Sequence, residues 1–356
     1  MGVVGAHSRA RRSLPRPWCG CIGRVGSPEC VGGRVGILTV CEAVSVTIEP
    51  PAPGEPRRPL GPRDPGDAWV VAPTGERYWG RFGAAGLLAV DPVRGVLLQH
   101  RVSWSHHGGT WALPGGARHE GESALDGALR EATEEAGVPE GAVRPRLMSV
   151  FDLGYWSYAT VVADVVGAFD PVISDPESVE LSWVPVADVD DYPLHPGFAA
   201  SWPRLRELLA VRPKIVVDAA NVIGSVPDGW WKDRAGAAER LVERLRGLAV
   251  RGIPGDALGL AEDRWYPEIK VVLEGKAREA APGAEVLYAA SYRTPDVLVI
   301  RAEAAGDDAI AWTAREEAEW GARVTVVTSD RELAARCEAI GASVRGTRWL
   351  LDLLQD

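Results

Sequence analysis

The sequence predicts an α/β protein of two successive domains that follow an irregular leader. The 356 residues are 46% hydrophobic and 25% charged, an ordinary globular composition and enough chain for two domains. From residue 67 onward, short apolar runs typical of strands alternate with amphipathic helical patterns. A short joint, Arg212-Pro213-Lys214, separates two such regions. We therefore expect a leader over 1–66, a first domain over 67–211 and a second over 212–356.

The leader is rich in Arg, Gly and Pro and has little periodicity, which is typical of a disordered segment or of residues added by an upstream start codon. It lacks the uninterrupted apolar core of a signal peptide. Four of the five cysteines lie here, and a zinc site is the alternative, although a C-x-C without a C-x2-C partner is a weak zinc pattern. The four are Cys19, Cys21, Cys30 and Cys41.

Composition also limits the partners and the cellular location that we expect. The net charge of −10 gives no large basic field for tight, non-specific nucleic-acid binding. No stretch approaches the roughly 18 apolar residues of a membrane helix. Nothing suggests a disulfide framework, because Cys337 lies alone in a helical pattern, so we expect a reducing, cytoplasmic location.

The first domain reads as strands with one embedded and one closing helix. Two apolar runs flank the turn-like DPVRG, and three more follow further along. Leu205, Leu208 and Leu209 recur at helical spacing near the end of this region. The expected strands are 82–90, 95–101, 147–151, 156–166 and 181–186, and the expected closing helix is 202–211.

The most specific pattern, GARHEGESALDGALREATEEAGV, runs from Gly116 to Val138. Glu131, Glu134 and Glu135 stand at i, i+3 and i+4, so on a helix they share one face. Like charges at that spacing repel, and a hard divalent cation would reverse the sign of that energy. The alternative is a solvated, Glu-rich surface helix. The fixed positions are Gly116, Glu122, Arg130, Glu131, Glu134, Glu135 and Gly137.

The residues around these acids predict how the helix begins and ends. Ser123 is a good N-cap, and Gly137 is a good left-handed stop. The opposite face carries apolar residues such as Leu129 that suit packing against a core. Gly115 and Gly116 precede the helix and let the backbone approach a phosphate or metal closely.

This spacing resembles the Nudix box, G-x5-E-x7-R-E-U-x-E-E-x-G-U, at every specified position. The resemblance implies an α/β/α sandwich with a mixed sheet over about 67–211, as in MutT-like Nudix hydrolases. It implies an enzyme that uses Mg²⁺ (or Mn²⁺) to cleave a nucleoside diphosphate linked to a moiety X. By resemblance, Glu131, Glu134 and Glu135 are the metal ligands, Arg130 orients Glu131, and Glu122 supports the loop.

The general base and the substrate contacts lie outside the pattern. Family members often use a glutamate beyond the helix or one within it, and Glu177 and Glu180 precede a Trp-Val-Pro where relatives carry an acid. A solvated loop acid is the alternative for both. Arg101, His106 and His107 flank the presumed entry loop and could meet phosphates or base, or be structural or simply exposed. With Gly115 and Gly116, Arg101 is our substrate-binding prediction.

The second domain shows another α/β alternation, with acids where strands end and helices begin. Asp218 follows an apolar run, Asp307 and Asp308 open a helix, and Asp330 ends a later run. Because carboxyl ends of parallel strands meet at one edge, these acids converge there; the alternative is that they are helix caps and turn formers. Expected strands are 214–223 (an apolar run), 269–273, 286–289, 324–330 and 343–345, and expected helices are 235–250, 306–320 and 332–340.

The D-x-x-N and T-S-D motifs, with these acids, resemble the PIN-like NYN domain, in particular its YacP-like branch. The resemblance covers about 213–356 and implies a Rossmannoid α/β/α domain with a mostly parallel sheet. It implies a metal-dependent ribonuclease with Asp218, Asp307, Asp308 and Asp330 as Mg²⁺ or Mn²⁺ ligands and Asn221 as polar support. Trp230-Trp231 could stack on RNA bases or pack against protein.

Two hypotheses of different class follow. In the first, the chain is a Nudix pyrophosphohydrolase fused to a PIN-like nuclease domain, acting on oxidised nucleoside triphosphates, nucleotide sugars or an RNA 5′ end. In the second, one or both domains sense nucleotides or bind RNA without catalysis. The Nudix resemblance also implies a homodimer, and no membrane partner is expected.

Overall fold

The computed structural model describes residues 45–51, 64–227, 229–281 and 297–355. The four leader cysteines and the expected strand 286–289 lie outside these residues. Within the expected leader, β1 (Thr47–Glu49) pairs antiparallel with β2 (Trp69–Val71), which pairs with β3 (Arg77–Trp79). That part of the leader is therefore a strand of a small sheet.

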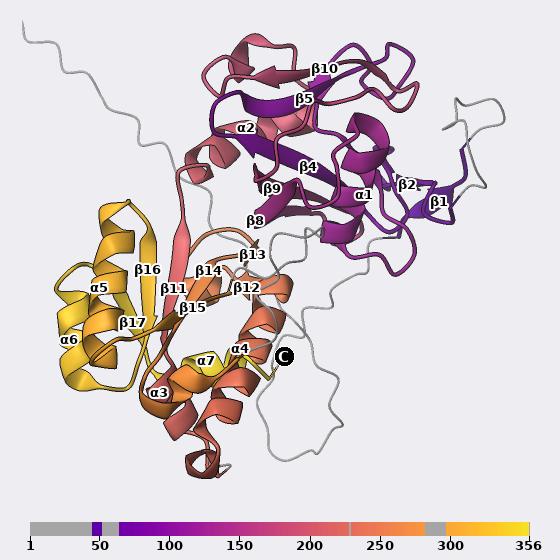
Figure 1. The fold of residues 1–356 in the computed structure, drawn as a ribbon. Coiled ribbons are helices and arrows are strands. Elements are labelled where there is room, and N and C mark those ends of the chain that lie inside the picture. Colours follow the sequence, from indigo (N-terminus) through magenta and orange to yellow (C-terminus); the bar gives the residue numbers. More distant parts are fainter. Residues whose placement is uncertain (1–44, 52–63, 228, 282–296, 356) are drawn as a thin grey trace, which may run out of the picture. The chain divides into compact units, whose positions relative to one another are not determined.

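The first large sheet is mixed, with the strand order β10-β5-β4-β9-β8-β13-β12 (Figure 1). Neighbours are antiparallel except β4 and β9, which run parallel. Two short strands add to it, β6 on β5 and β7 on β4. The bounds are β4 (Ala84–Asp91), β5 (Gly95–Arg101), β6 (Trp111–Ala112), β7 (Gly115–Ala117), β8 (Val143–Asp152), β9 (Ser157–Val165) and β10 (Ser178–Val184).

Two helices cover opposite faces of this sheet. Side chains alternate along β4, so Leu87 joins a core with helix α1 (Ala124–Ala136) and Leu88 joins a core with helix α2 (Pro196–Leu208). This is the α/β/α sandwich that the sequence predicted. Helix α2 begins six residues before the expected start, because His195 caps it and a proline occupies its first position.

A strand pair from beyond residue 212 completes the same sheet. β12 (Ile253–Pro254) pairs with β13 (Arg264–Trp265), and β13 pairs antiparallel with β8 through Trp265 opposite Leu147. Trp265 is fully buried in the core under α2. The strands of the first sheet therefore come from both sides of the joint at 212.

The second large sheet is parallel throughout, in the order β15-β14-β11-β16-β17. Val217 of β11 packs with α4, and Val216 packs with α5 and α6 on the other face. The bounds are β11 (Pro213–Asp218), β14 (Glu268–Leu273), β15 (Val297–Arg301), β16 (Arg323–Val327), β17 (Ser343–Arg345), α3 (Ala219–Gly224), α4 (Arg234–Arg251), α5 (Gly306–Glu319), α6 (Arg331–Glu338) and α7 (Thr347–Leu353).

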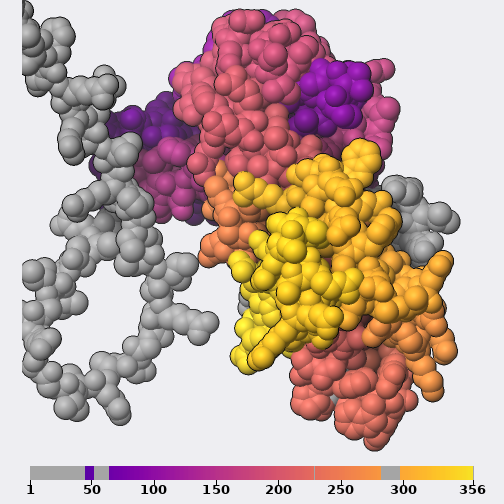
Figure 2. All heavy atoms as spheres, turned by 90° about the vertical axis from the view of Figure 1, so that its left-hand side faces the viewer, coloured from indigo at the N-terminus to yellow at the C-terminus, as the bar shows by residue number. Residues whose placement is uncertain are grey.

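The expected apolar run 214–223 divides into β11 and α3, because the Asp218 side chain accepts the Asn221 N–H and starts the helix. β15 and α7 were not expected. Short 3₁₀ turns complete the described chain. Helices α5 and α6 face the viewer in Figure 2. Among the described residues, no helix is long and apolar enough to cross a bilayer. The turns are Val189–Asp191, Trp230–Lys232, Asp256–Leu258 and Gly275–Glu279.

Candidate functional site

The acidic helix α1 begins and ends where the sequence predicted. Ser123 accepts the Asp126 N–H as N-cap. Gly137 ends the helix at φ 63°, in the left-handed region that favours glycine, and donates to the last turn. The apolar face, including Ala128 and Leu129, is buried against the sheet. The helix therefore holds its acids at a fixed position beside the core.

Arg130 joins the acids into one network. Its Nε and Nη2 donate to the two carboxylate oxygens of Glu122, at 2.8 and 2.9 Å. Its Nη1 donates to Glu131 at 2.9 Å and to Glu134 at 3.1 Å. Bidentate pairing of this kind fixes geometry as well as charge. Arg130 thus reaches Glu134 and Glu122 in addition to Glu131, the one partner that the sequence predicted for it.

Burial and pairing act in opposite directions on this network. Burial alone would lower the pKa of Arg130, but its hydrogen bonds and charge contacts with Glu122 and Glu131 raise that pKa above its ordinary value. Burial alone would raise the pKa of Glu122, yet the Arg130 hydrogen bonds and the His119 N–H lower it. Both groups are therefore held in their charged forms.

Close backbone packing positions the two buried acids. Glu131 and Glu135 are each 1% exposed. Glu135 accepts the Gly115 N–H at 2.8 Å. A Cβ at Gly116 would lie 2.8 Å from the Glu131 carboxyl carbon, and one at Gly115 would lie 2.6 Å from the Ala85 carbonyl oxygen. Contacts within the protein therefore account for both glycines. Their predicted role in binding substrate stays a prediction.

Tyr158 of β9 lies beside these acids and was not predicted. Burial raises the pKa of its hydroxyl; Arg101 acts in the opposite direction, and Glu135 and Glu131 add to the rise. The hydroxyl occupies the space that a Cβ at Gly86 would need, at 2.2 Å. An aromatic residue in an apolar strand carries no sequence signal for such a position.

Arg101 lies at the end of β5, half-buried, with its Nε buried and without a hydrogen-bond partner in the described part of the chain. Its charge acts on Tyr158 and also on His106 and His195. A buried guanidinium nitrogen without a partner can donate to an anionic oxygen. The substrate-binding role expected for Arg101 stays a prediction.

Glu180 lies elsewhere. It stands on the edge strand β10, exposed, opposite His100 of β5. Within the described residues it makes no side-chain hydrogen bond or ion pair. Glu177 precedes the strand, and its carbonyl accepts the Val102 N–H. These contacts hold Glu180 against β5 and the Glu177 backbone against the end of that strand.

The donor set on α1 suits a hard divalent cation. Three carboxylates occupy one turn, and Glu134 is the most open of them, with its side chain 45% exposed. Mg²⁺ and Mn²⁺ favour such oxygen ligands. Among the described residues, however, these acids do not form a group of three whose ligand atoms all lie within 4.8 Å, and neither do the aspartates of the second sheet.

In the second sheet, Asp218 is fixed at the end of the central strand. It is 3% exposed and accepts from the Asn221 N–H at 3.0 Å, the Asn221 side-chain amide at 2.6 Å and the Thr328 hydroxyl at 2.8 Å. Asn221 thus supports Asp218, as expected. Thr328 had not been singled out.

Three further acids gather at this edge. Burial raises the pKa of Asp307, and the charges of Asp218, Asp330 and Glu274 raise it further, against Arg336. Glu274, the residue after β14, was missed by the sequence reasoning; it accepts the Gly306 N–H at 2.9 Å. The available sequence signal was an acid directly after an apolar strand, but no recognisable motif surrounds Glu274.

Capping accounts for some of these acids and not for others. Asp218 caps α3 and Asp330 caps α6, accepting the Leu333 N–H at 2.8 Å. Asp307 lies in the first turn of α5 and caps nothing. Asp308 pairs with Arg336 at 2.7 Å, with its side chain 73% exposed. Asp308 therefore stands apart from the other predicted ligands.

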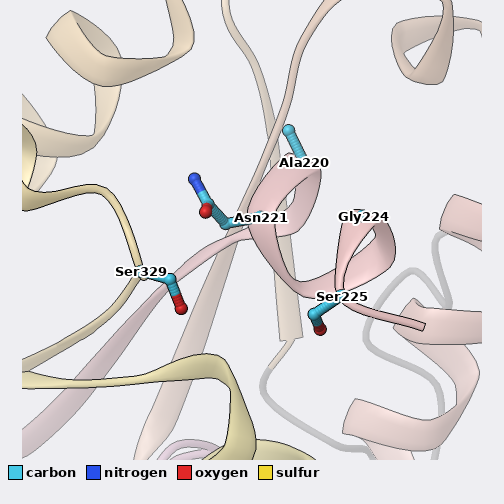
Figure 3. Close-up of a pocket in the computed structure, with 5 residues that line it drawn as sticks. All are labelled: Ala220, Asn221, Gly224, Ser225 and Ser329. Atoms are coloured by element: carbon cyan, nitrogen blue, oxygen red, sulfur yellow. The ribbon is translucent and has the colours of Figure 1, made fainter.

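An open hollow of about 430 Å³ lies next to this edge. Figure 3 shows Asn221 and Ser225 on one side of it and Ser329 on the other. Because Asn221 also binds Asp218, the hollow adjoins the acidic cluster. Its lining residues are Ala220, Asn221, Gly224, Ser225 and Ser329.

The similarities to known proteins fall in the region of the first large sheet. The family profile for the NUDIX domain matches residues 80–207. The chain is 50% identical over 161 residues to a Mycobacterium tuberculosis protein named "Putative 8-oxo-dGTP diphosphatase 3"; the match spans 42% of this chain and 74% of that protein.

Two further similarities fall in the same range. A "Nucleoside triphosphate pyrophosphatase/Nudix hydrolase fusion protein" of Bifidobacterium longum is 43% identical over 148 residues, 39% of this chain and 31% of that protein. The crystal structure of a Nudix hydrolase from M. smegmatis, RenU, is 50% identical, with a TM-score of 0.38; the match covers 41% of this chain and 96% of that one.

Proposed function

The chain belongs to the Nudix family, so it is a hydrolase of phosphorus anhydrides, and we propose that it converts a nucleoside triphosphate to the monophosphate and diphosphate. We propose an oxidised purine nucleotide as the preferred substrate, because a relative named as an 8-oxo-dGTP diphosphatase shares half of its residues over 161 positions. The proposed Nudix domain is 67–211, with β12 and β13 completing its sheet.

One observation carries the activity: the Arg130 network holds Glu122, Glu131 and Glu134 together beside Gly115 and Gly116. We assign Glu131, Glu134 and Glu135 as ligands of Mg²⁺ or Mn²⁺. When bound, the cation neutralises phosphate oxygens and polarises the attacked phosphorus. Arg101, whose Nε is buried and unpaired among the described residues, donates to a phosphate oxygen of the substrate.

Proton transfer is assigned to a box glutamate. Water attacks a phosphorus of the internal anhydride, the bond to the bridging oxygen breaks, and diphosphate leaves. Glu134 accepts the proton from the attacking water, because its carboxylate is the most open of the three. Glu180 is the alternative, exposed on the edge strand β10.

The test is ³¹P NMR of the full chain with Mg²⁺ and 8-oxo-dGTP, dGTP or a nucleotide sugar. Glu134→Gln is expected to lose turnover by at least ~100-fold, as general-base removal does, whereas Glu180→Gln retains it. Mn²⁺ binding to both variants, followed by electron paramagnetic resonance, separates the roles: Glu134→Gln that still binds Mn²⁺ has lost proton transfer, and one that does not has lost a ligand. A wild type that cleaves none of these nucleotides would contradict the proposal.

We also propose that residues 212–356 are a PIN-like NYN domain that cleaves RNA with Mg²⁺ or Mn²⁺. The supporting observation is that Asp218, Asp330 and Glu274 lie near enough to Asp307 to add to the rise that burial gives its pKa, at one edge of a parallel sheet. The proposed ligands are Asp218, Asp307 and Asp330, joined by Glu274, with Asn221 in support. Asp308, paired with Arg336, is the weakest member of the predicted set.

The nuclease test uses a fluorophore-labelled single-stranded RNA with Mn²⁺. Asp218→Asn should abolish cleavage, and Asp308→Asn should keep at least half of it. A wild type that binds this RNA without cutting it would favour the regulatory alternative for this region. The proposed homodimer is tested on the same preparation by light scattering.

A further inference from the structure

Three histidines from two distant segments meet outside the acidic helix. His106 and His107 lie in the loop between β5 and β6, and His195 precedes α2. One ligand atom from each side chain lies within 4.8 Å of the other two. Among the described residues this is the one group of three His, Cys, Asp or Glu side chains that meets that criterion.

The loop is built to hold these rings together. The Thr110 hydroxyl donates to the His107 carbonyl at 2.6 Å, and a Cβ at Gly108 would lie 2.3 Å from the Val102 carbonyl oxygen. His107 has φ 53°, one of two non-glycine residues with positive φ in the described chain. Such a backbone persists where its surroundings determine it, and it is a feature that clusters at binding sites.

The rings themselves are in contact. The centroids of His106 and His107 are 4.1 Å apart, and those of His107 and His195 are 4.8 Å apart. His106 also packs edge-on against Trp69 at 5.3 Å. His106 and His107 are exposed, so an ion at the cluster keeps access to water for its remaining ligand positions.

The chemistry of the donors selects the ion. The group contains imidazole nitrogen and no carboxylate, so it suits Zn²⁺, Cu²⁺ or Ni²⁺ and not Mg²⁺. Burial lowers the pKa of His195 to about 4, and the charges of His107 and Arg101 lower it further. A neutral imidazole ring keeps one nitrogen lone pair that can bind such an ion.

We propose that His106, His107 and His195 form a binding site for a zinc-class transition-metal ion, separate from the magnesium-type acids of α1. The ion ties the β5–β6 loop to the start of α2, with the fourth position taken by water. The site lies beside Arg101, whose charge acts on both His106 and His195. Its occupancy therefore sets the environment of the residue assigned to the substrate phosphate.

Metal binding has a local consequence at α2. Nδ1 of His195 accepts the Gly197 N–H at 3.1 Å and caps the helix. A metal on Nδ1 takes that lone pair, and a metal on Nε2 moves the ring proton to Nδ1. Either way the capping hydrogen bond is lost. The Gly197 amide therefore reports on the site without any measurement of activity.

A bound anion is the competing explanation, because Arg101 and Arg77 both act on His106. Their positive charge disfavours a cation held by charge alone, so the site requires an ion that bonds strongly to imidazole. Inorganic phosphate separates the two explanations, because it binds the arginines and leaves a neutral imidazole cluster uncoordinated.

The experiment titrates the full chain with Co²⁺ and Zn²⁺ in excess Mg²⁺, after alkylation of the cysteines. His107→Asn is the main variant, because asparagine tolerates positive φ, and His106→Gln is the second. His119→Gln is the matched control: this histidine lies outside the group. Both cluster variants should weaken Zn²⁺ binding by more than the ~10- to 100-fold that loss of an outer-shell partner costs, and Zn²⁺ should speed hydrogen exchange at Gly197.

Equal Zn²⁺ affinity in wild type and His107→Asn would overturn the proposal. An absence of Co²⁺ d–d absorption in the wild type would also overturn it. So would a change in Gly197 hydrogen exchange that inorganic phosphate causes and Zn²⁺ does not. These outcomes are independent of nucleotide turnover, so the zinc site can fail while the proposed hydrolase activity holds.

Discussion

The two acidic regions of this molecule manage negative charge in opposite ways. On α1, Arg130 supplies a built-in cation that contacts Glu122, Glu131 and Glu134 and lowers the pKa of Glu122. At the edge of the second sheet, burial raises the pKa of Asp307, and three like charges raise it further. In the first region, Arg130 therefore offsets part of the repulsion between the carboxylates. The second carries an electrostatic cost that a bound cation would relieve.

The largest expected effect comes from removing the built-in cation. Arg130→Ala removes the cation that pairs with Glu122 and Glu131, and breaking a buried pair costs about 3 kcal/mol or more. Urea unfolding measures the change. Arg348→Ala is the control, because its pair with Asp352 is exposed and worth about 0.5 kcal/mol or less. Equal losses in the two variants would show that Arg130 is not a structural centre of the first region.

Next in size is Gly116→Ala, which places a Cβ 2.8 Å from the Glu131 carboxyl carbon. Overpacking of this kind costs about 1–3 kcal/mol, and displacing Glu131 should also lower kcat. Thermal unfolding and single-turnover kinetics are the measurements. Gly247→Ala makes the same chemical change inside α4, about one turn before its end, where the nearest side-chain atom is an arginine tip at 3.4 Å. That control should stabilise by up to about 1 kcal/mol.

A smaller effect of opposite sign is expected from Asp307→Asn. Because the folded-state pKa of Asp307 is raised, its contribution is neutral at low pH and becomes destabilising as pH rises through that pKa. The variant should gain less than about 1 kcal/mol at pH 7 and nothing below the unfolded pKa of about 3.9, since solvent screens the group. Unfolding at pH 3 and pH 7 tests this. An equal gain in unfolding free energy at pH 3 and pH 7 would show that the effect does not come from the Asp307 charge.

The smallest effect is expected from Asp308→Asn. Its pair with Arg336 is exposed and is worth between about 0 and 1 kcal/mol. Mn²⁺ should raise the melting temperature of this variant as much as that of wild type, whereas Asp307→Asn should lose the part of the Mn²⁺ effect that comes from the second sheet. If Asp308→Asn loses it too, the metal site includes Asp308, as the sequence first suggested.

The sequence predicted the first region well because its pattern is local. Ser123, the three glutamates and Gly137 lie on one helix, so spacing alone determines which side chains share a face. Tyr158 escaped prediction, because it reaches the acids only through the pairing of β9 with β4. The roles of Glu131, Glu134 and Glu135 in binding metal stay predictions.

The second region depends on the order of strands, which spacing does not reveal. Glu274 approaches Asp307 because β14 lies next to β15, the strand that leads into α5, a neighbour relation set by tertiary structure. Asp308 was grouped with Asp307 because they are adjacent in sequence, yet helix geometry points adjacent residues in different directions. β12 and β13 have two residues each, too few to show a period-two pattern.

The pairing of β13 with β8 also sets an order of events during synthesis. Leu147 pairs with Trp265, so the edge of the first sheet cannot close until residues more than a hundred positions further along the chain have been made. Until then the core under α2 lacks Trp265. Contacts between such distant positions slow folding, because the intervening loop must close first. The edge of the first sheet can therefore close only after residues 264–265 have been made.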